Sequence, residues 1–418
     1  MGKPKIRFEG YREDWEQRKL GDITTKIGSG KTPKGGAAAY KDDGIALIRS
    51  QNVNGDRVDL SDVVFIDEQT DEDMKNSRVL KGDVLLNITG ASIGRSAVFT
   101  RELRANVNQH VCIIRTKGSD ASPEFIQLNI ISSNGQNQID SFQAGGGREG
   151  LNFHQIGKME FLYPGIEEQQ KIGQYFANLD HLITLHQRKC DEIKTLKKYM
   201  LQKMFSQNGE KVPEIRFNGF TEDWEQRKLG EVLKLENGYA FKSQFFSDNE
   251  TNIIVATPGN VSVDGGFIEE GGKYYKIDGE IPDAYIFHPG DLFVTMTDLT
   301  PTANTLGKPA TVPDNGVMYL HNQRLGKLIG FEGDKAFLYS LLCTSEYHNY
   351  MVVTASGSTV RHSSPGRILE YEIAIPGLDE QIKIGKYFSN LDHLITLHQR
   401  KCNELKEIKK YMLQNMFV

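Results

Sequence analysis

The sequence predicts an α+β protein in which one unit is written twice. Two globular blocks are joined by two long antiparallel coiled-coil helices, with pseudo-two-fold internal duplication. Residues 4–22 recur at 213–231 with 14 of 19 positions identical, and residues 167–205 recur at 379–417 with 30 of 39 identical. The offsets are 209 residues (213 − 4) and 212 residues (379 − 167). A period of about 200 residues is far too long for a solenoid and fits a duplicated domain.

Each half begins with the short recurring leader, continues with a variable block and closes with the recurring helical segment. The blocks, roughly 23–160 and 232–372, resemble each other only faintly. A shared scaffold with two divergent inserts indicates one task performed on two different targets. The predicted boundaries are 1–165 for the first globular domain, 166–208 for the first helix, 209–377 for the second globular domain and 378–418 for the second helix.

Composition excludes several classes of protein. The 418-residue chain is 38% hydrophobic and 25% charged, and it has no run of 18 apolar residues, so no membrane span is expected. Its first residues are charged and lack the apolar segment of a secretory signal, so the cytoplasm is the expected location. The four cysteines are too far apart in sequence to predict a zinc site or a disulfide scaffold. A net charge of −5 does not by itself predict nucleic-acid binding, which would need local patches or a partner's help.

The two closing segments have the pattern of long amphipathic helices. Residues 167–205 contain no proline, and apolar side chains recur at alternating steps of three and four, with one break at Lys197. Two such helices in one chain can pair with each other antiparallel, and a dimerisation coiled coil between two chains is the alternative. The predicted pairing and docking residues are Ile172, Phe176, Leu179, Ile183 and Ile193, with Ile384, Phe388, Leu391, Ile395 and Leu405 in the copy. A second apolar flank widens the stripe, so further helices from a partner are expected to dock on Leu182, Leu185, Leu196 and Tyr199.

Both variable blocks predict short strands separated by turns, with few helices. The predicted strands are 45–49, 84–88 and 111–115 in the first block and 253–256, 292–296 and 372–375 in the second. The predicted helices are 122–133 and 334–347.

Loops beside these strands carry side chains suited to base edges and phosphates. Asn and Gln can bond adenine with two hydrogen bonds, Arg can bond guanine, and Lys, Ser and Thr can bond phosphate. Each residue taken singly is more often an ordinary turn or surface residue, so the prediction depends on their clustering in both blocks. The DNA-binding candidates in the first block are Ser29, Lys31, Thr32, Arg49, Gln51, Asn52, Asn87, Thr89, Arg95, Gln109, His110, Arg148 and Asn152. Those in the second block are Tyr239, Lys242, Ser243, Thr257, Asn260, Thr295, Thr297, Asn322, Gln323, Arg324, Ser358, Arg361 and His362.

Two segments resemble catalytic or cofactor-binding motifs, but neither fits the motif and its context fully. Residues 28–32 look like the end of a phosphate-binding loop, but Thr25 stands where the first glycine is required. Residues 145–150 fit G-x-G-x-x-G but follow a helical, polar stretch instead of a strand, which leaves Arg148 as a phosphate-ligand candidate only. The histidines form no metal-binding motif. The sequence therefore predicts no catalytic residue, no metal and no cofactor in this chain.

Over essentially its whole length the chain resembles the DNA-specificity subunit of a type I restriction–modification enzyme. The most specific phrases are the leader DWEQRKLG at 14–21 and 223–230, and the helices EEQQKIGQYFANLDHLI at 167–183 and DEQIKIGKYFSNLDHLI at 379–395. Further phrases look like those of target-recognition domains, namely GSGKTP at 28–33, VLKGDVLLNITGASIGRSAVF at 79–99, LNFHQIGKMEFLYP at 151–164 and ENGYAFKS at 236–243.

The resemblance implies that each block is a target-recognition domain reading one half of an asymmetric, bipartite site in double-stranded DNA. The helices would set the gap between the halves, which would lie about 34–36 Å apart on B-DNA. They would also dock two modification (methyltransferase) subunits, and two restriction (translocase and nuclease) subunits would complete the complex. S-adenosylmethionine, ATP and Mg would belong to those partners, and this subunit would be non-catalytic.

Two alternatives remain open at this stage. One is a coiled-coil adaptor that carries two protein-binding domains and never touches DNA. The other is a self-contained DNA-modifying enzyme, which would need a cofactor-binding motif that the sequence does not show.

Overall fold

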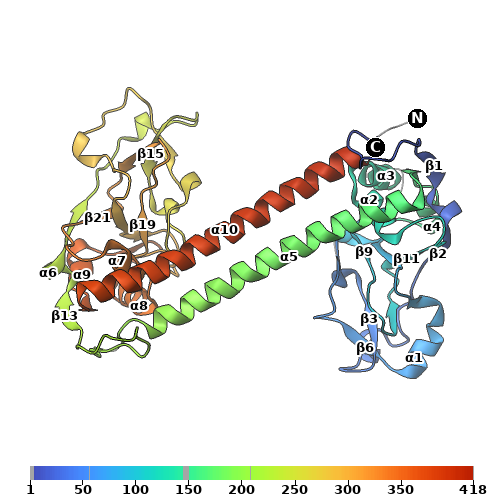
Figure 1. Ribbon diagram of the computed structural model, residues 1–418, viewed down its shortest axis with the longest axis horizontal. Helices are drawn as coiled ribbons and strands as arrows, with labels where there is room; N and C mark the ends of the chain where they lie inside the picture. The colour runs from blue at the N-terminus through green and yellow to red at the C-terminus, as the bar shows by residue number, and fades with distance from the viewer. Residues whose placement is uncertain (1–3, 56, 145–149, 208, 418) are drawn as a thin grey trace. The chain divides into compact units, whose positions relative to one another are not determined.

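A computed structural model describes residues 4–55, 57–144, 150–207 and 209–417 (Figure 1). The chain divides by its internal contacts into two compact units. The first unit contains the residues up to Gln187 together with those from Gln399 onward, and the second contains Arg188–His398. The division falls within both long helices, so each unit holds a part of each.

The first unit has two four-stranded sheets, of order β6-β3-β10-β7 and β2-β11-β8-β9, together with the pairs β1-β12 and β4-β5. Its helices are α1 (Glu68–Asp73), α2 (Pro123–Ile131), α3 (Ser133–Ala144), α4 (Phe153–Gly157) and the beginning of α5 (Ile166–Lys203). Its strands are β1 (Glu16–Lys19), β2 (Thr24–Ser29), β3 (Ile45–Ile48), β4 (Val53–Asn54), β5 (Arg57–Val58), β6 (Val64–Ile66), β7 (Arg78–Val79), β8 (Val84–Asn87), β9 (Ser96–Val98), β10 (Ala105–Val107), β11 (Val111–Thr116) and β12 (Glu160–Tyr163).

The second unit has sheets of order β14-β21-β17-β19 and β16-β15-β20, and the pairs β13-β23 and β18-β22. Its helices are α6 (Leu229–Val232), α7 (Lys335–Leu342), α8 (Ser345–Thr354), α9 (Pro365–Leu369) and the beginning of α10 (Leu378–Met416). Its strands are β13 (Glu225–Lys228), β14 (Lys234–Asn237), β15 (Ile253–Ala256), β16 (Lys273–Tyr274), β17 (Leu292–Thr295), β18 (Thr297–Asp298), β19 (Pro309–Thr311), β20 (Met318–His321), β21 (Leu325–Ile329), β22 (Arg361–His362) and β23 (Glu372–Ile375).

The two blocks share one topology although their sequences have diverged. In the first unit β11 pairs antiparallel with β2 and β8, and β10 pairs parallel with β3. In the second unit β21 pairs antiparallel with β14 and β17, and β20 pairs parallel with β15. The duplication therefore extends through the blocks, where the sequence shows it only faintly.

Burial on both faces explains why the central strands are almost wholly apolar. Side chains alternate between the two faces of a strand. In β8, Leu85 packs between the two sheets of the first unit, whereas Val84 and Leu86 face the core that contains Phe125 of α2 and Phe176 of α5. A strand covered on both sides has no solvent face that would favour polar residues.

The two recurring leaders and closing helices are joined by ion pairs in both units. The Arg7 guanidinium donates two hydrogen bonds of 2.7 Å to the Glu168 carboxylate, and Arg216 donates bonds of 2.7 and 2.8 Å to Glu380. Both glutamates are buried. A two-pronged Arg–carboxylate pair holds its partners in one geometry, so each leader is fixed to the start of a closing helix.

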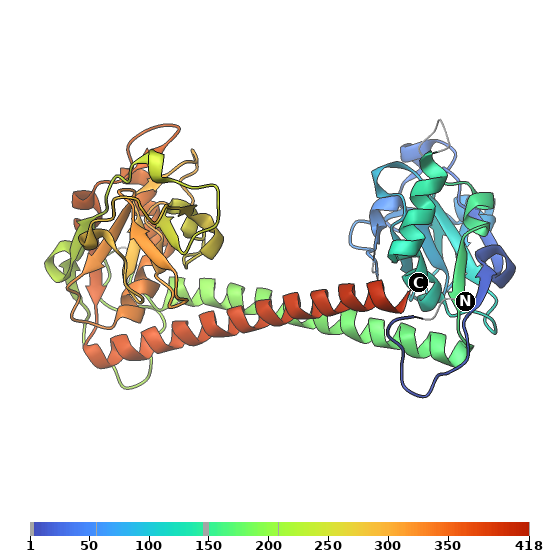
Figure 2. The same cartoon turned by 90° about the horizontal axis from the view of Figure 1, so that it is seen from above.

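Helices α5 and α10 run antiparallel where they meet inside each unit, as both views show for the first unit (Figures 1 and 2). There, Lys409 of α10 pairs with Asp180 of α5 at 2.5 Å. In the second unit Lys197 of α5 pairs with Asp392 of α10, also at 2.5 Å. The fold class predicted from the sequence, two α+β domains and two long antiparallel helices in a duplicated chain, is confirmed.

The apolar helix stripe is not only a helix–helix seam. Ile172, Phe176 and Leu179 lie in the first unit's main core with Leu405, and Ile183 packs at its edge. Ile384, Phe388 and Leu391 lie in the corresponding core of the second unit, where Ile193 packs at the edge, and Ile395 is half-buried. Because these cores also contain α2 or α7, each helix buries much of its stripe against the globular part of its own unit.

The predicted strands are observed to within two residues, as β3, β8, β11, β15, β17 and β23. The helix predicted at 122–133 is α2, which is two residues shorter at its C-terminal end. The prediction of a single helix at 334–347 is wrong in one respect. The observed helix, α7, ends at Leu342. A second helix, α8, begins at Ser345 because the Thr344 side chain caps its N-terminus by accepting from the Tyr347 N–H.

Candidate nucleic-acid interface

Four strand ends of the first unit meet at one edge and bring most of its candidate residues together. The Gly30 N–H donates to the Asn108 carbonyl at 3.2 Å, and the Asn108 N–H donates to the Ile48 carbonyl at 3.0 Å. The Ile88 N–H donates to the His110 carbonyl at 3.0 Å. These bonds join the ends of β2, β3, β8 and β10. Ser29, Arg49–Asn52, Asn87–Thr89 and Gln109–His110 are therefore neighbours at this edge.

Four further candidates of the first block follow or adjoin the same edge. Lys31 and Thr32 continue the chain from Gly30. The Arg95 carbonyl accepts from the Asn87 N–H at 2.8 Å, which places the Arg95 backbone beside β8. Asn152 follows Leu151, whose N–H donates to the Ile88 carbonyl at 2.9 Å.

The corresponding edge of the second unit gathers its candidates in the same way. The Tyr239 N–H donates to the His321 carbonyl at 2.8 Å, and the Gln323 N–H donates to the Tyr239 carbonyl at 3.1 Å. The Met296 N–H donates to the Arg324 carbonyl at 2.8 Å. Thr257 follows β15 directly, and β15 ends beside His321, so Thr257 belongs to this edge as well.

Two glycines at equivalent positions allow this close meeting of strands. A Cβ on Gly30 would stand 1.6 Å from the Val107 carbonyl oxygen, and one on Gly238 would stand 2.2 Å from the Asn322 carbonyl oxygen. No side chain fits such an approach. In the segment at 28–32 that resembles a phosphate-binding loop, Gly30 thus allows close packing of the backbone.

Asp298 orders the loop that follows the second unit's edge. Its carboxylate accepts four hydrogen bonds of 2.6–2.7 Å from the backbone and hydroxyl groups of Thr300 and Thr305. Burial by itself raises the pKa of Asp298, but these hydrogen bonds outweigh burial and lower it. The carboxylate therefore stays charged and holds the loop in place.

Several candidates use their polar atoms inside the fold. The Asn52 and Asn260 amides are buried in equivalent capping boxes. The fully buried Asn87 amide donates to the Ser50 carbonyl, and the buried Thr295 hydroxyl donates to the Thr305 carbonyl. Buried Thr297 contacts His362 at 3.0 Å. These five side chains shape the edge and are inaccessible in this structure.

Other candidates are exposed or half-buried but have partners within the chain. The Arg49 guanidinium and the Gln51 amide both donate to Asp62, and Lys242 pairs with Glu280 at 2.7 Å. Asn152 caps α4, and the Thr257 hydroxyl donates to the Gly271 carbonyl. Thr89 and Gln109 contact the His110 ring at 2.5 and 2.8 Å. The Asn322 side chain accepts from the Arg324 N–H, and the Arg361 guanidinium donates to the Val352 carbonyl.

The most accessible candidates lie at the rim of each edge. Within the described ranges, no side-chain hydrogen bond or ion pair is formed by Lys31, Thr32, Arg95, Ser243, Gln323, Arg324 or Ser358. The Ser29 hydroxyl makes one long hydrogen bond, of 3.4 Å, to the carbonyl of the neighbouring Gly30. Arg148, also predicted as a DNA ligand, lies outside the described residues.

Two aromatic residues at these edges were not predicted. The Tyr285 ring stacks on Tyr239 with centroids 5.1 Å apart, and the Arg49 guanidinium lies 5.8 Å from the centre of the Tyr40 ring. Neither tyrosine lies in a recognisable motif. Only the fold brings residue 285 next to residue 239, so no local signal could have identified it.

The second apolar flank of the helices is exposed in this chain. Leu182 and Leu185 are 40% and 44% exposed, and the equivalent Leu394 and Leu397 are 39% and 51% exposed. The same holds for Leu196, Tyr199, Ile408 and Tyr411. Large apolar side chains in a repeating row on a helix surface are typical of a contact surface.

In the parts of the chain that the structure describes, no group of three or more His, Cys, Asp or Glu side chains could hold a metal ion. No helix among the described residues is long and apolar enough to cross a membrane.

Residues 12–195 and 221–407 match the family described as the type I restriction modification DNA specificity domain. The chain belongs to this family. The two matches cover both units of the duplication, and the strand-end edges lie inside them.

Curated specificity subunits are similar over part of their length. The chain is 23% identical to the type I restriction enzyme MjaVIII specificity subunit of Methanocaldococcus jannaschii over 264 residues, 60% of this chain and 59% of that subunit. It is 27% identical to the EcoBI specificity subunit of Escherichia coli over 212 residues, 48% of this chain and 44% of that one. The chain thus spans about half the length of these relatives in each match.

Solved structures share the fold over the whole chain. A type I restriction–modification S subunit from M. genitalium aligns over 100% of this chain and 99% of its own, with a TM-score of 0.63 and 12% identity. A chain from a study of assembly and conformational transition of a type I R-M system aligns over 98% and 99%, with a TM-score of 0.53 and 15% identity. At these identities the likeness concerns the fold alone.

Proposed function

We propose that this protein is the DNA-specificity subunit of a type I restriction–modification complex, in which each unit reads one half of an asymmetric, bipartite DNA site. The observation that carries the proposal is the duplicated edge. The same four strand ends meet in both units, on the same topology, but present different side chains. Two readers of one design with different lining residues fit two different half-sites.

The exposed candidates divide by chemistry. Lys31 and Thr32 suit phosphate, whereas Arg95, Gln323 and Arg324 suit base edges. The buried residues of the edge, such as Asn52 and Asn260, would position these groups without touching DNA. Because the net charge is −5, partner subunits would supply many of the phosphate contacts.

The helices would set the unread gap and dock the partners. We assign the exposed apolar flank of α5 and α10 to two methyltransferase subunits, and expect two restriction subunits to join them. S-adenosylmethionine, ATP and Mg would then act in those partners, and this chain would supply recognition without chemistry, in the cytoplasm.

A block exchange tests the modular reading. Residues 23–160 are replaced by the corresponding block of another specificity subunit, and adenine methylation is mapped across the genome of a host that also carries the modification subunit. We expect one half of the methylated motif to change while the other half and the gap remain. A change in both halves together would contradict the proposal, as would methylation unaffected by deleting this gene.

A four-residue insertion near Gln187 provides the matched test of the helices. It adds about one helical turn, roughly 6 Å at 1.5 Å per residue. We expect the gap of the methylated motif to lengthen while both half-sites stay the same. An unchanged gap in a folded, methylating variant would remove the spacer role from the helices.

A further inference from the structure

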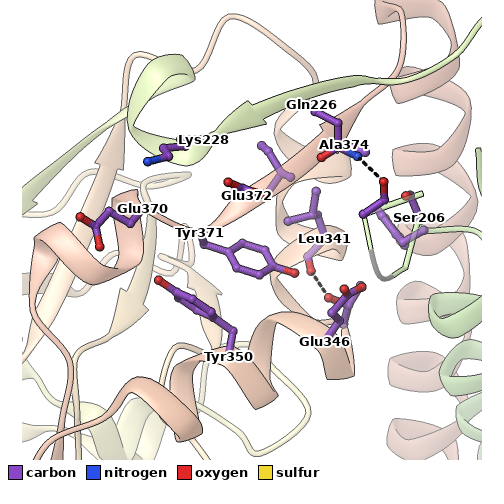
Figure 3. Close-up of a pocket in the computed structure, with 14 residues that line it drawn as sticks. Ser206, Gln226, Lys228, Leu341, Glu346, Tyr350, Glu370, Tyr371, Glu372 and Ala374 are labelled. Carbon is purple, nitrogen blue, oxygen red and sulfur yellow. Dashed lines mark hydrogen bonds between the residues drawn. The ribbon is translucent and has the colours of Figure 1, made fainter. Parts of the chain in front are cut away.

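Two surface hollows occupy equivalent positions in the two units. One, of about 910 Å³, is lined in the first unit by Gln17, Gln138 and Glu160 among others. The other, of about 590 Å³, is lined in the second unit by the equivalent Gln226, Tyr350 and Glu372 (Figure 3). Both lie where the leader strand meets its partner strand and the helix beside it, α3 or α8. Neither hollow contains a residue of the DNA-binding candidate set.

Each hollow borders the edge of a two-stranded sheet. In the second unit the Leu229 N–H donates to the Tyr371 carbonyl at 2.9 Å, at the end of the β13–β23 ladder. Hydrogen-bonded and non-hydrogen-bonded pairs alternate in an antiparallel ladder. Glu372 and Ala374 are therefore non-hydrogen-bonded positions, and their N–H and C=O groups point away from β13. The Leu20 N–H, bonded to the Met159 carbonyl at 2.9 Å, gives Glu160 the same orientation in the first unit.

A side chain closes this edge in the first unit. The Gln138 amide donates to the Glu160 carbonyl at 2.9 Å, and its oxygen accepts from the Glu160 N–H at 2.9 Å. The amide therefore makes the same two bonds that a residue of an added strand would make. In the first unit the outward-facing backbone of Glu160 is therefore satisfied internally.

The second unit lacks this closure. The position equivalent to Gln138 is Tyr350, whose hydroxyl donates instead to the Arg367 carbonyl at 2.9 Å. In the described part of the second unit, no protein group bonds the outward N–H or C=O of Glu372 or Ala374. Strand edges with unpaired backbone groups are templates for pairing with another chain. Ala374, where the first unit has Leu162, also leaves more room above the edge.

The lining of the open hollow selects for positive charge. Glu346, Glu370 and Glu372 line it against one basic residue, Lys228. The Tyr350 and Tyr371 rings lie side by side below the strand, with centroids 5.0 Å apart, and offer aromatic faces to a cation (Figure 3). An acidic lining repels a phosphate backbone and therefore disfavours DNA, whereas an unpaired strand edge suits a polypeptide.

We propose that the open edge of β23 is a docking site for an extended, basic peptide segment of a partner protein, which adds to it as a further strand. The backbone of Glu372 and Ala374 would supply the main-chain hydrogen bonds, and the glutamates and tyrosines would receive Lys or Arg side chains at alternate positions. The site goes beyond the DNA-reading role and occurs in one unit only.

Peptide display on the full chain tests this. A random heptapeptide library is selected on the wild-type protein, on Tyr350→Gln, which copies the closing amide of the first unit, and on Tyr350→Phe, which keeps the ring. We expect peptides with Lys or Arg at alternate positions, retained by wild type and Tyr350→Phe and at least about tenfold weaker on Tyr350→Gln. Equal capture by all three proteins, enrichment of acidic peptides or no enrichment would overturn the proposal.

Amide hydrogen exchange with one enriched synthetic peptide locates the site. The peptide should slow exchange at Glu372 and Ala374 in the full chain, and protection confined to other amides would overturn the assignment. The reciprocal variant Gln138→Tyr should open the first unit's edge and add a second binding site. Methylation mapping of Tyr350→Gln distinguishes the two proposals, since an unchanged motif keeps the DNA role whatever the peptide result.

Discussion

At the scale of single residues, backbone clearance and buried polar groups set the strongest constraints. Gly30 and Gly238 lie where two strand ends meet at both candidate interfaces, and a Cβ would overlap a carbonyl oxygen at either one. His321 lies under the edge of the second unit, where its imidazole contacts the Leu325 carbonyl at 2.9 Å. These groups shape the interface without reaching its surface.

We expect Gly30→Ala to destabilise the first unit by roughly 1–3 kcal/mol, as for other overpacked sites. The new methyl group would meet backbone, which cannot rotate away. Gly28→Ala is the control, because Gly28 lies in β2, the strand that ends just before Gly30, and a Cβ at Gly28 meets nothing within 4 Å. Denaturant unfolding of both variants measures the difference, and equal stabilities would refute the close-approach explanation.

His321 should make the second unit sensitive to mild acid. Burial lowers the pKa of His321 to about 4, against partial compensation by its bond to the Leu325 carbonyl. The unfolded chain takes up a proton near pH 6.5 and the folded chain does not, so this contribution is present above pH 6.5 and is lost as the pH falls toward 4. We expect a loss of about 2 kcal/mol between pH 7 and pH 5. The dependence of the unfolding free energy on pH should be weaker in His321→Phe. An equal dependence in that variant would exclude His321 as its source.

At the scale of elements, the two long helices carry a polar interruption that explains the break in their heptad pattern. Lys197 and Lys409 occupy equivalent seam positions, and each reaches an aspartate of the other helix at 2.5 Å. The Cys190 and Cys402 thiols contact the Ile395 and Ile183 carbonyls at 3.9 Å. Matching contacts in both units favour one register, because a slip by a single turn would separate both ion pairs.

Removing the aspartate of such an ion pair should lower the stability of the protein more than removing the lysine. Asp392→Ala leaves the Lys197 ammonium, which is 11% exposed, without its carboxylate. We expect it to destabilise the protein by roughly 1–2 kcal/mol, with Lys197→Met close to neutral. The double variant should recover most of the loss in a double-mutant cycle followed by denaturant unfolding. Equal effects of the two single variants would show that the pair does not act through a buried charge.

At the scale of the whole molecule, the leader of each repeat packs on the end of the helix of the other repeat. The Ile215 N–H donates to the Lys203 carbonyl at 2.8 Å, and the equivalent Ile6 N–H donates to the Asn415 carbonyl at 3.1 Å. In the second unit a continuous chain joins these parts, whereas in the first unit they come from opposite ends of the sequence. The noncovalent junction copies the covalent one.

A circular permutant follows from this equivalence. The chain is opened between residues 206 and 212, and a copy of that segment joins Phe417 to Pro4. We expect a folded protein whose stability lies within roughly 1 kcal/mol of the original, because the two loops are of equal length. The methylated motif should stay the same. A permutant that fails to fold would show that the two junctions are not equivalent.

The recurring segments could be predicted from sequence because their information is local. Heptad periodicity identified α5 and α10, and short apolar runs between turn signals identified β3, β8, β11, β15, β17 and β23. The break between α7 and α8 was missed because a threonine cap, and not a Gly or Pro, separates the two helices. The parallel pairings β3–β10 and β15–β20 join segments far apart in the chain, so no local pattern announces them.

The types of residue at the candidate interface could be predicted from the sequence, but the role of each residue could be predicted only in part. The sequence by itself determined the duplication, the two long helices, the family and the strand ends that carry polar side chains, because repeats and periodicity are written along the chain. Only the tertiary structure decided which of those side chains are accessible. Asn87 and Thr295 are buried and Arg95 and Arg324 are exposed, because burial depends on strands that meet across long sequence distances. The same cause separates the closed edge at Gln138 from the open one at Tyr350.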